Sequence, residues 1–305
     1  MTRFLFKMAT AGAVLFACVA PASAQGTPAV PVKGGVIDVS TIGEPPTLDS
    51  MVSTADIVGM ISQHIFETLY TFDEKWSPKP LLADGMPTFA DGGKSVTIKL
   101  RPGVKFHDGS DFDADDAVAS LNRWLTLSPR GKSVAATVTK VEKVDALSVK
   151  LTLTGPLAPL LPLLSFNNSA AIMLPSDKTG PQMTETIGTG PYKLIERKPD
   201  QFIRLGRFEG YKSPPGAADG YAGARGNHLD EIRFVPVPDA NSRVEAMLAG
   251  QHQYSESMPV ESIDRLKGKA GIAPIILKPF GFPIFAMNMR KGIMTNLDLR
   301  RAVIA

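Results

Sequence analysis

The sequence predicts a globular α/β protein, and three observations carry that prediction. In residues 95–100, Val96, Ile98 and Leu100 alternate with polar residues, as in a half-buried strand. Residues 113–125 instead repeat apolar side chains at helical spacing. The composition, with 44% hydrophobic and 21% charged residues among 305, is that of a globular chain long enough for one large or two ordinary domains.

Residues 1–24 have the pattern of a secretory signal peptide. Arg3 and Lys7 provide a positive start, an apolar run too short to span a bilayer follows, and Ala22-Ser-Ala24 is a small-residue cleavage site. We expect cleavage after Ala24, which leaves Gln25 at the mature end and places the protein in the periplasm. The net charge of +3 includes both basic residues of this segment, and no Lys/Arg cluster elsewhere indicates a nucleic-acid partner.

Cys18 offers a second, less favoured interpretation of the same segment. Residues 15–18 partly resemble a bacterial lipobox, which would make Cys18 a lipid-bearing amino terminus. The bulky Phe16 and the cleavage site that follows favour soluble export. Because Cys18 is the only cysteine, the mature protein is expected to contain no disulfide.

Residues 25–33 are expected to be a flexible lead-in, and the elements that follow can be assigned in order. Residues 34–40 alternate as a strand, and the prolines of the 43–49 loop impose an extended path. Ser53 or Thr54 can then cap a helix whose apolar stripe runs from Ile57 to Leu69.

The middle of the chain continues this alternation of strands and helices. Residues 91–94 form a hairpin turn into the 95–100 strand, and Asp113 with Asp116 forms a capping box for the next helix. Two strands are expected within 138–153, others near 202–206 and 227–235, a surface loop from 206 to 227, and a helix capped by Asp239 and closed by Gly250.

Several stretches resemble one family. Residues 100–118, LRPGVKFHDGSDFDADDAV, are similar to the signature of the extracellular solute-binding proteins of the peptide/nickel class, family 5. Residues 187–194, IGTGPYKL, resemble a second signature, and the strand, EPPTLD loop and helix at 34–70 resemble the opening of that family. Residues 80–94 and 239–250 resemble further blocks in the same order.

This resemblance implies a periplasmic-binding-protein fold of type II, with mixed sheets and flanking helices in each of two lobes. Residues 34–275 would form the first lobe, with 51–184 as an inserted subdomain, and 276–305 would cross to the start of the second lobe. Residues 296–305 resemble the first turns of a helix and contain no Gly or Pro stop. We therefore expect the second lobe to be largely missing, as in a truncated reading frame.

No catalytic or metal-binding constellation is recognisable. The four histidines have no metal-ligand spacing, and His107-Asp108 is better explained as a turn because no activated nucleophile accompanies it. Gly188-Thr-Gly190 lacks the lysine of a phosphate loop, so we interpret its glycines as a flexible entry to a strand. The acidic run at 111–116 suits a helix amino terminus better than a calcium loop. We expect no enzyme activity, metal or cofactor.

The resemblance implies a monomeric substrate-binding component of an ABC importer, which binds peptides or similar small solutes between its lobes and docks on permease subunits. The first-lobe residues predicted to contact the ligand are polar loop residues, namely Glu44, Thr47, Ser53, Thr54, Asn167, Asn168 and Tyr192. Two alternatives remain, a secreted hydrolase with an unrecognised site and a truncated fragment that binds nothing.

Overall fold

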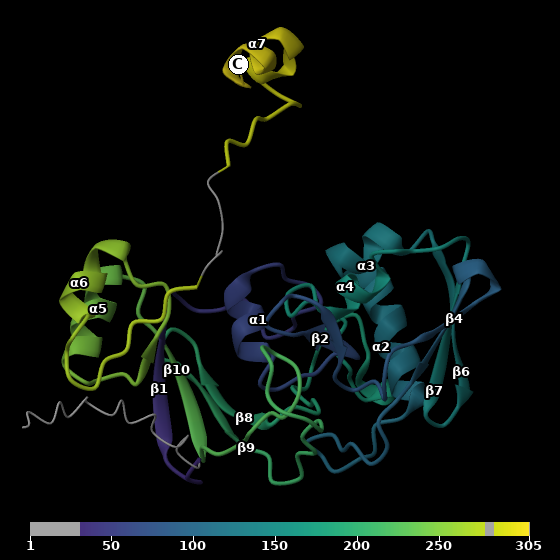
Figure 1. Cartoon of the computed structure of the whole chain (residues 1–305), viewed down its shortest axis with the longest axis horizontal. Helices are drawn as coiled ribbons and strands as arrows, with labels where there is room; N and C mark the ends of the chain where they lie inside the picture. Colours follow the sequence, from purple (N-terminus) through teal and green to yellow (C-terminus); the bar gives the residue numbers. More distant parts are fainter. Residues whose placement is uncertain (1–30, 278–283, 305) are drawn as a thin grey trace, which may run out of the picture.

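The computed structural model describes residues 31–277 and 284–304 (Figure 1). The predicted signal peptide, its cleavage site, Cys18 and most of the lead-in lie outside the described residues. The described residues form two larger sheets, a two-stranded ribbon and their helices. Most of the buried apolar side chains belong to one continuous core.

The first sheet has five strands in the order β11-β1-β10-β9-β8. β1 runs parallel to both of its neighbours, whereas β9 is antiparallel to β10 and to β8. Alternation sets the buried face, since Ile203 and Leu205 of β9 pair with Phe234 and Ile232 of β10 and all four are buried. The strands are β1 (Val36–Thr41), β8 (Tyr192–Lys198), β9 (Phe202–Arg207), β10 (Glu231–Pro236) and β11 (Tyr254–Ser255).

The second sheet has four antiparallel strands in the order β4-β5-β7-β6, and its sequence lies between β1 and β8. Val96 and Ile98 of β5 pair with Leu151 and Val149 of β7, and these residues are buried together with Trp124 of α2. The predicted strands at 95–100 and 138–153 are confirmed. The elements are β4 (Thr88–Ala90), β5 (Ser95–Lys99), α2 (Ala114–Leu127), α3 (Pro129–Val134), β6 (Val138–Asp145) and β7 (Ser148–Leu153).

The amino terminus of α2 confirms the predicted capping box. Oδ1 of Asp113 accepts hydrogen bonds from the amides of Asp115 and Asp116, at 2.8 and 3.3 Å. Oδ2 of Asp116 accepts in return from the amide of Asp113 at 3.0 Å. Helix-capping accounts for the acidic run, as the sequence indicated.

The helix expected from residue 57 to 69 is much shorter than predicted. α1 spans Asp56–Ser62, and its N-cap is Ala55, which makes no side-chain capping bond. Ile65 and Leu69 are fully buried, although they lie beyond the helix. The apolar stripe therefore predicted burial correctly but predicted the length of the helix wrongly. An irregular buried segment also directs its apolar residues toward the core.

Shorter elements join the two sheets. The β2–β3 ribbon packs against α4, and α4 is brief because Pro159 precedes it and Pro162 lies within it. Between β4 and β5, the predicted turn is a single 3-10 turn, Asp91–Gly93. The remaining elements of this region are β2 (Tyr70–Phe72), β3 (Pro78–Pro80), α4 (Leu160–Ser165) and the 3-10 turn Ser176–Lys178.

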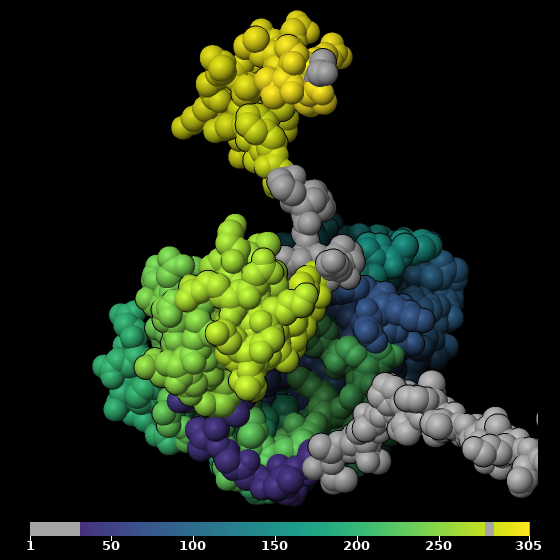
Figure 2. Space-filling view, turned by 60° about the vertical axis from the view of Figure 1, so that its left-hand side comes forward, coloured from purple at the N-terminus to yellow at the C-terminus, as the bar shows by residue number. Residues whose placement is uncertain are grey.

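The carboxyl-terminal elements follow β10. α5 (Ala240–Leu248) begins with Asp239 accepting from the amide of Ser242 at 2.7 Å, and Gly250 lies beyond its end with a φ of 71°, as predicted. The 3-10 turn Val260–Ser262 leads into α6 (Ile263–Leu266), and the 3-10 turn Ile293–Thr295 precedes α7 (Leu297–Ile304). Residues 284–304 stand clear of the body, and most of their apolar side chains are exposed (Figure 2).

Candidate ligand-binding site

Glu44 and Thr47 lie on the loop that follows β1. Oε1 of Glu44 accepts hydrogen bonds from Nε and Nη2 of Arg197, at 2.8 and 2.6 Å. Oγ1 of Thr47 accepts from the amide of Asp49 at 3.0 Å, which is a local turn contact. Both side chains therefore shape the loop. Oε2 of Glu44 is buried and has no partner among the described residues.

A buried ion pair fixes the end of this loop to α2. Nη1 and Nη2 of Arg123 lie 3.2 and 2.5 Å from the carboxylate oxygens of Asp49, and the two side chains are only 3% and 6% exposed. Nε of Arg123 also donates to the carbonyl of Gly180 at 2.7 Å. Because a buried pair with all of these bonds tolerates little movement, the loop that bears Glu44 and Thr47 has a defined position.

Ser53, Thr54 and Asn168 lie together beside the start of α1. The carbonyl of Ser53 accepts from the amide of Ser169 at 2.8 Å, and the carbonyl of Thr54 accepts from Nδ2 of Asn168 at 3.3 Å. Nδ2 of Asn168 also donates to Oδ1 of Asp56 at 2.8 Å. The structure thus brings three of the predicted residues into one cluster, although they were chosen only as polar loop positions.

Arg130 of α3 belongs to the same cluster and was missed in the sequence. Its Nη2 donates to Oδ1 of Asn168 at 2.8 Å, its Nε donates to the carbonyl of Asn168 at 3.2 Å, and its Cζ lies 3.8 Å from the centre of the Phe166 ring. Partial burial lowers the pKa of Arg130, while the nearby charge of Asp56 opposes that shift. No local pattern could reveal the cluster, because 38 residues separate Arg130 from Asn168.

Asn167 lines a small polar cavity. The cavity, of about 30 Å³, could hold about one water molecule and is also lined by Ser50, Glu67 and Arg225. The backbone of Asn167 approaches α1 so closely that a Cβ on Gly59 would lie 2.8 Å from its carbonyl oxygen. Glycine at this position of α1 therefore allows the close approach.

Tyr192 lies away from the other predicted residues. It begins β8, is 4% exposed, and its hydroxyl accepts from the amide of Leu229 at 3.2 Å. Its ring also meets that of His64 edge-on, with 6.2 Å between the centres. A contact between Tyr192 and a solute stays a prediction, which this buried position does not favour.

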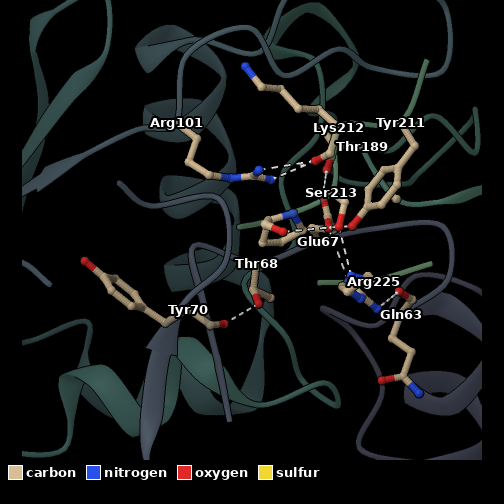
Figure 3. Close-up of polar contacts among 12 residues, drawn as sticks. Gln63, Glu67, Thr68, Tyr70, Arg101, Thr189, Tyr211, Lys212, Ser213 and Arg225 are labelled. Atoms are coloured by element: carbon tan, nitrogen blue, oxygen red, sulfur yellow. Dashed lines mark hydrogen bonds and ion pairs between the residues drawn. The ribbon is translucent and has the colours of Figure 1, made fainter. Parts of the chain in front are cut away.

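A second polar cluster is centred on Glu67, whose side chain is completely buried (Figure 3). Oε1 of Glu67 accepts from the hydroxyl of Tyr211 at 2.9 Å and from Nη1 of Arg225 at 3.2 Å, while Oε2 accepts from Oγ1 of Thr189 at 2.9 Å. Nη2 of Arg225 donates to the carbonyl of Gln63 at 2.9 Å. Burial and the carboxylate raise the pKa of Tyr211, so its hydroxyl stays a donor.

The Glu67 cluster fastens the loop that follows β9. Besides Tyr211 and Arg225, this loop presents the carbonyl of Lys212 to Nη1 and Nη2 of Arg101, each at 3.2 Å. Nζ of Lys212 donates to the carbonyl of Pro102 at 2.6 Å. The loop expected at 206–227 is confirmed from residue 208 onward, and these polar contacts hold it against the body.

His107 binds the backbone of the IGTGPYKL segment, residues 187–194. Its Nε2 donates to the carbonyl of Gly190 at 3.0 Å and its Nδ1 accepts from the amide of Gly188 at 3.3 Å, so the ring is neutral. Burial lowers the pKa of His107 to about 4. The turn role expected for His107-Asp108 is confirmed, since Oδ1 of Asp108 accepts from the amide of Ser110.

The glycines of this segment serve a different purpose from the predicted flexibility. A Cβ on Gly188 would lie 2.1 Å from the carbonyl oxygen of Ile65, and a Cβ on Gly190 would lie 2.5 Å from that of His64. Neither glycine has a positive φ. Close packing against residues 64–65 therefore excludes a side chain at both positions.

His64 is a packed side chain in the body of the protein. Its ring lies 5.8 Å from that of Phe234, measured between centres, in addition to its contact with Tyr192. Burial, and secondarily the charge of Arg225, lower the pKa of His64 to about 4. Both buried histidines are thus neutral near pH 7.

The described residues include no group of three or more His, Cys, Asp or Glu side chains that could hold a metal ion. Within the same ranges, no helix has the length and apolar character needed to cross a membrane. Glu67 is saturated by three donors, and its neighbouring hydroxyls donate to it. The Glu67 cluster can therefore hold loops in place. Of the two polar clusters, the one around Asn168 has polar groups close to the surface.

The mixed sheets and flanking helices are shared with solved solute-binding proteins. Residues 77–305 match the middle region of the bacterial extracellular solute-binding proteins, family 5, and the chain belongs to that family. This confirms the resemblance found in the sequence and the predicted α/β fold with mixed sheets and flanking helices.

Individual relatives agree with this assignment. The chain is similar to the glutathione-binding protein GsiB of Escherichia coli (strain K12), with 28% identity over 265 residues that cover 84% of this chain and 49% of GsiB. It also resembles the oligopeptide-binding protein AppA of Bacillus subtilis in complex with a nonapeptide, with a TM-score of 0.63, 28% identity, and 77% and 46% of the two chains covered.

The periplasmic binding protein DppA of Helicobacter pylori, in complex with the peptide STSA, shows the same fold with a TM-score of 0.67 at 21% identity. It is covered over 50% of its length, together with 78% of this chain. The chain thus spans about half the length of the curated relatives it matches.

Proposed function

We propose that this protein is the substrate-binding component of an ABC importer and reversibly binds peptides or similar small solutes. The observation that carries the proposal is the family match over residues 77–305. Such a protein needs a ligand site between two lobes, because a ligand held from both sides loses its water and can couple binding to closure. The closed form would then dock on permease subunits at the inner membrane.

The loops around α1 are the proposed first-lobe contribution to that site. Ser53, Thr54, Asn167 and Asn168 lie on adjoining loops, and the Glu44–Thr47 loop is anchored by the Asp49–Arg123 pair. Polar backbone and side-chain groups suit a peptide, whose own amide and terminal groups are the same in every sequence. We keep residues 34–275 as the proposed first lobe, with 51–184 inserted in it and 276–305 leading to the second.

Glutathione and a nonapeptide are the first solutes to test, since relatives bind them. We expect saturable, reversible binding of at least one of them in a calorimetric titration of the purified chain. Recovery of the unchanged solute by mass spectrometry separates binding from hydrolysis. Cleavage of the solute would support a hydrolase instead, and binding of neither would support a fragment that binds no solute of this class.

Export is the cellular part of the proposal. We expect the protein to be found in the periplasm as a monomer that begins at Gln25, after removal of the signal peptide. An intact mass from the periplasmic fraction tests this, and a mass for a chain that begins with lipidated Cys18 would favour the anchored alternative. A cytoplasmic protein that retains Met1 would contradict export.

A further inference from the structure

The guanidinium of Arg130 has one amino group that no other described residue uses. Nε and Nη2 both donate to Asn168, but Nη1 makes no hydrogen bond to any described part of the chain. An ion pair is missing as well, since no carboxylate of the described residues lies within 4.0 Å of Arg130. Arg130 is half-buried, and the charge of Asp56 acts on it without an ion pair between the two side chains.

The other buried or half-buried arginines of the body bind carboxylates or backbone carbonyls, although Nε of Arg101 and Nε of Arg243 are buried without a partner among the described residues. Arg101 and Arg243 direct their amino groups at backbone carbonyls. The remaining ones pair with carboxylates, and they are Arg123, Arg197, Arg204, Arg207, Arg225 and Arg233. Arg130, Arg101 and Arg243 thus have no carboxylate partner among the described residues, and of these three only Arg130 has an amino group that binds nothing in the described chain.

Two neighbours hold Arg130 in one orientation. Asn168 accepts hydrogen bonds from Nε and Nη2 of Arg130, and Nδ2 of Asn168 itself donates to Asp56 and to the carbonyl of Thr54. Phe166 lies against the guanidinium face, and its own ring meets that of Phe72 edge-on at 5.1 Å between centres. A donor fixed in this way loses little conformational freedom when it binds an anion.

We propose that Arg130 is the anion-binding residue of the first lobe and takes a carboxylate group of the bound solute through Nη1. Asn168 and Phe166 are its positioning residues. Asn168 was predicted from the sequence to touch the ligand, but its amide is already occupied on both sides, so its contribution passes through Arg130. A charge-assisted hydrogen bond from a preoriented guanidinium selects carboxylates over neutral groups. The part of this proposal that concerns the solute rests on the proposed function, whereas anion binding at Arg130 can be measured without any solute.

Acetate tests the anion site without any assumption about the solute. Side-chain amide resonances of arginine are followed by NMR while sodium acetate is added to the chain at constant ionic strength. We expect a saturable shift for Nε–H of Arg130 that Arg233 does not share, because Arg233 is already paired with Asp38 and Glu231. A shift of Arg130 no larger than that of Arg233 would overturn the proposal.

A matched pair of solutes tests the carboxylate preference in the solute site. Glutathione and its diethyl ester are titrated into the wild type, Arg130→Gln and the control Arg233→Gln. For Arg130→Gln we expect glutathione to bind about tenfold more weakly, with the ester unaffected. The control should bind both like the wild type. Equal binding of glutathione to Arg130→Gln and the wild type would refute the role in the solute site.

The two titrations separate failure of the inference from failure of the function. If acetate saturates Arg130 and neither glutathione nor the nonapeptide binds, the anion site stands and the solute-binding function fails. If a solute binds and acetate leaves Arg130 unaffected, the function stands and the inference fails. Unchanged melting of Arg130→Gln shows that any loss is local, and Asn168→Ala should weaken acetate binding while Arg130 itself is retained.

Discussion

Two arginines, Arg225 and Arg130, hold comparable positions beside the loops around α1 and differ in what they bind. Arg225 donates to the buried carboxylate of Glu67 and to the carbonyl of Gln63, inside a cluster that Tyr211 and Thr189 complete. Arg130 instead binds a neutral amide and lies against an aromatic ring.

The difference separates a structural cluster from a binding one. The Glu67 cluster joins segments that are 122, 144 and 158 residues apart in the chain, and each oxygen of its carboxylate is occupied. Loss of the Glu67 cluster should therefore lower the stability of the fold far more than it changes ligand specificity. The Arg130 cluster contains no buried pair of an arginine with a carboxylate. Its loss should therefore alter ligand binding and change the stability of the fold little. Four predictions test this contrast.

The largest effect is expected for Glu67→Gln. The substitution removes the charge that pairs with Arg225 and replaces one accepting oxygen by an amide nitrogen that can only donate. Loss of one member of a buried pair destabilises by about 3–5 kcal/mol. Urea unfolding measures the change. Glu209→Gln is the control, because Glu209 pairs with Arg207 while 73% exposed. Equal unfolding midpoints for Glu67→Gln and the wild type would contradict the structural role.

Acid should weaken the packing beside the Glu67 cluster next. His64 and His107 have folded pKa values of about 4, below the ordinary 6.5, so between these values the unfolded chain binds more protons. The stability they contribute is complete above pH 6.5 and is lost as the pH falls toward 4, by about 3 kcal/mol for each histidine at pH 4.

Unfolding free energies from pH 7.5 to 4 measure this acid effect. His107→Gln should flatten part of the dependence, because glutamine does not titrate. A profile for His107→Gln as steep as that of the wild type would show that His107 is not among the responsible groups.

Tyr211→Phe should have a smaller effect. The ring still fills its place, while Glu67 loses one donor and keeps Arg225 and Thr189. The loss of a hydrogen bond to a charged group amounts to about 2 kcal/mol. Thermal unfolding measures it, with Tyr254→Phe as the control, because Tyr254 is 51% exposed. A loss as small as that of the control would mean that the hydroxyl adds nothing to the cluster.

Asp56→Asn should have the smallest effect on folding. Asp56 is exposed and an asparagine can still accept from Nδ2 of Asn168, so stability should change by no more than about 0.5 kcal/mol. Removing its charge should strengthen acetate binding at Arg130 by about twofold, since screening keeps exposed charge effects small. Weaker acetate binding would show that Asp56 matters to Arg130 through its geometry rather than its charge.

The sequence predicted those parts of the fold that depend on nearby residues. Asp113 caps the helix that follows it, and Asp239 does the same three residues before Ser242. The length of α1 was predicted wrongly, because Ile65 and Leu69 are buried by tertiary contacts that a periodic pattern cannot distinguish from a helix face. Glycines 188 and 190 were misinterpreted for the same reason, since the backbone they accommodate lies more than a hundred residues earlier.

The candidate site was less predictable than the fold. Ser53, Thr54 and Asn168 lie together, although they were selected only as polar loop residues, and Arg130 had no local signal in the sequence. Glu67 belonged to a recognised stretch, yet its three partners come from two distant segments. Clusters of this kind form because the chain topology brings distant segments together, and that topology cannot be predicted from composition and residue spacing.

The parallel pairing of β1 with β10 also sets an order on folding. The amide of Gly35, just before β1, donates to the carboxylate of Asp230, 195 residues later, whereas β5, β6 and β7 pair across much shorter stretches of the chain. Closing so long a loop is entropically unfavourable until the segment between is compact. A chain that folds as it is synthesised would therefore complete its second sheet early, with β1 unpaired until β10 has been made.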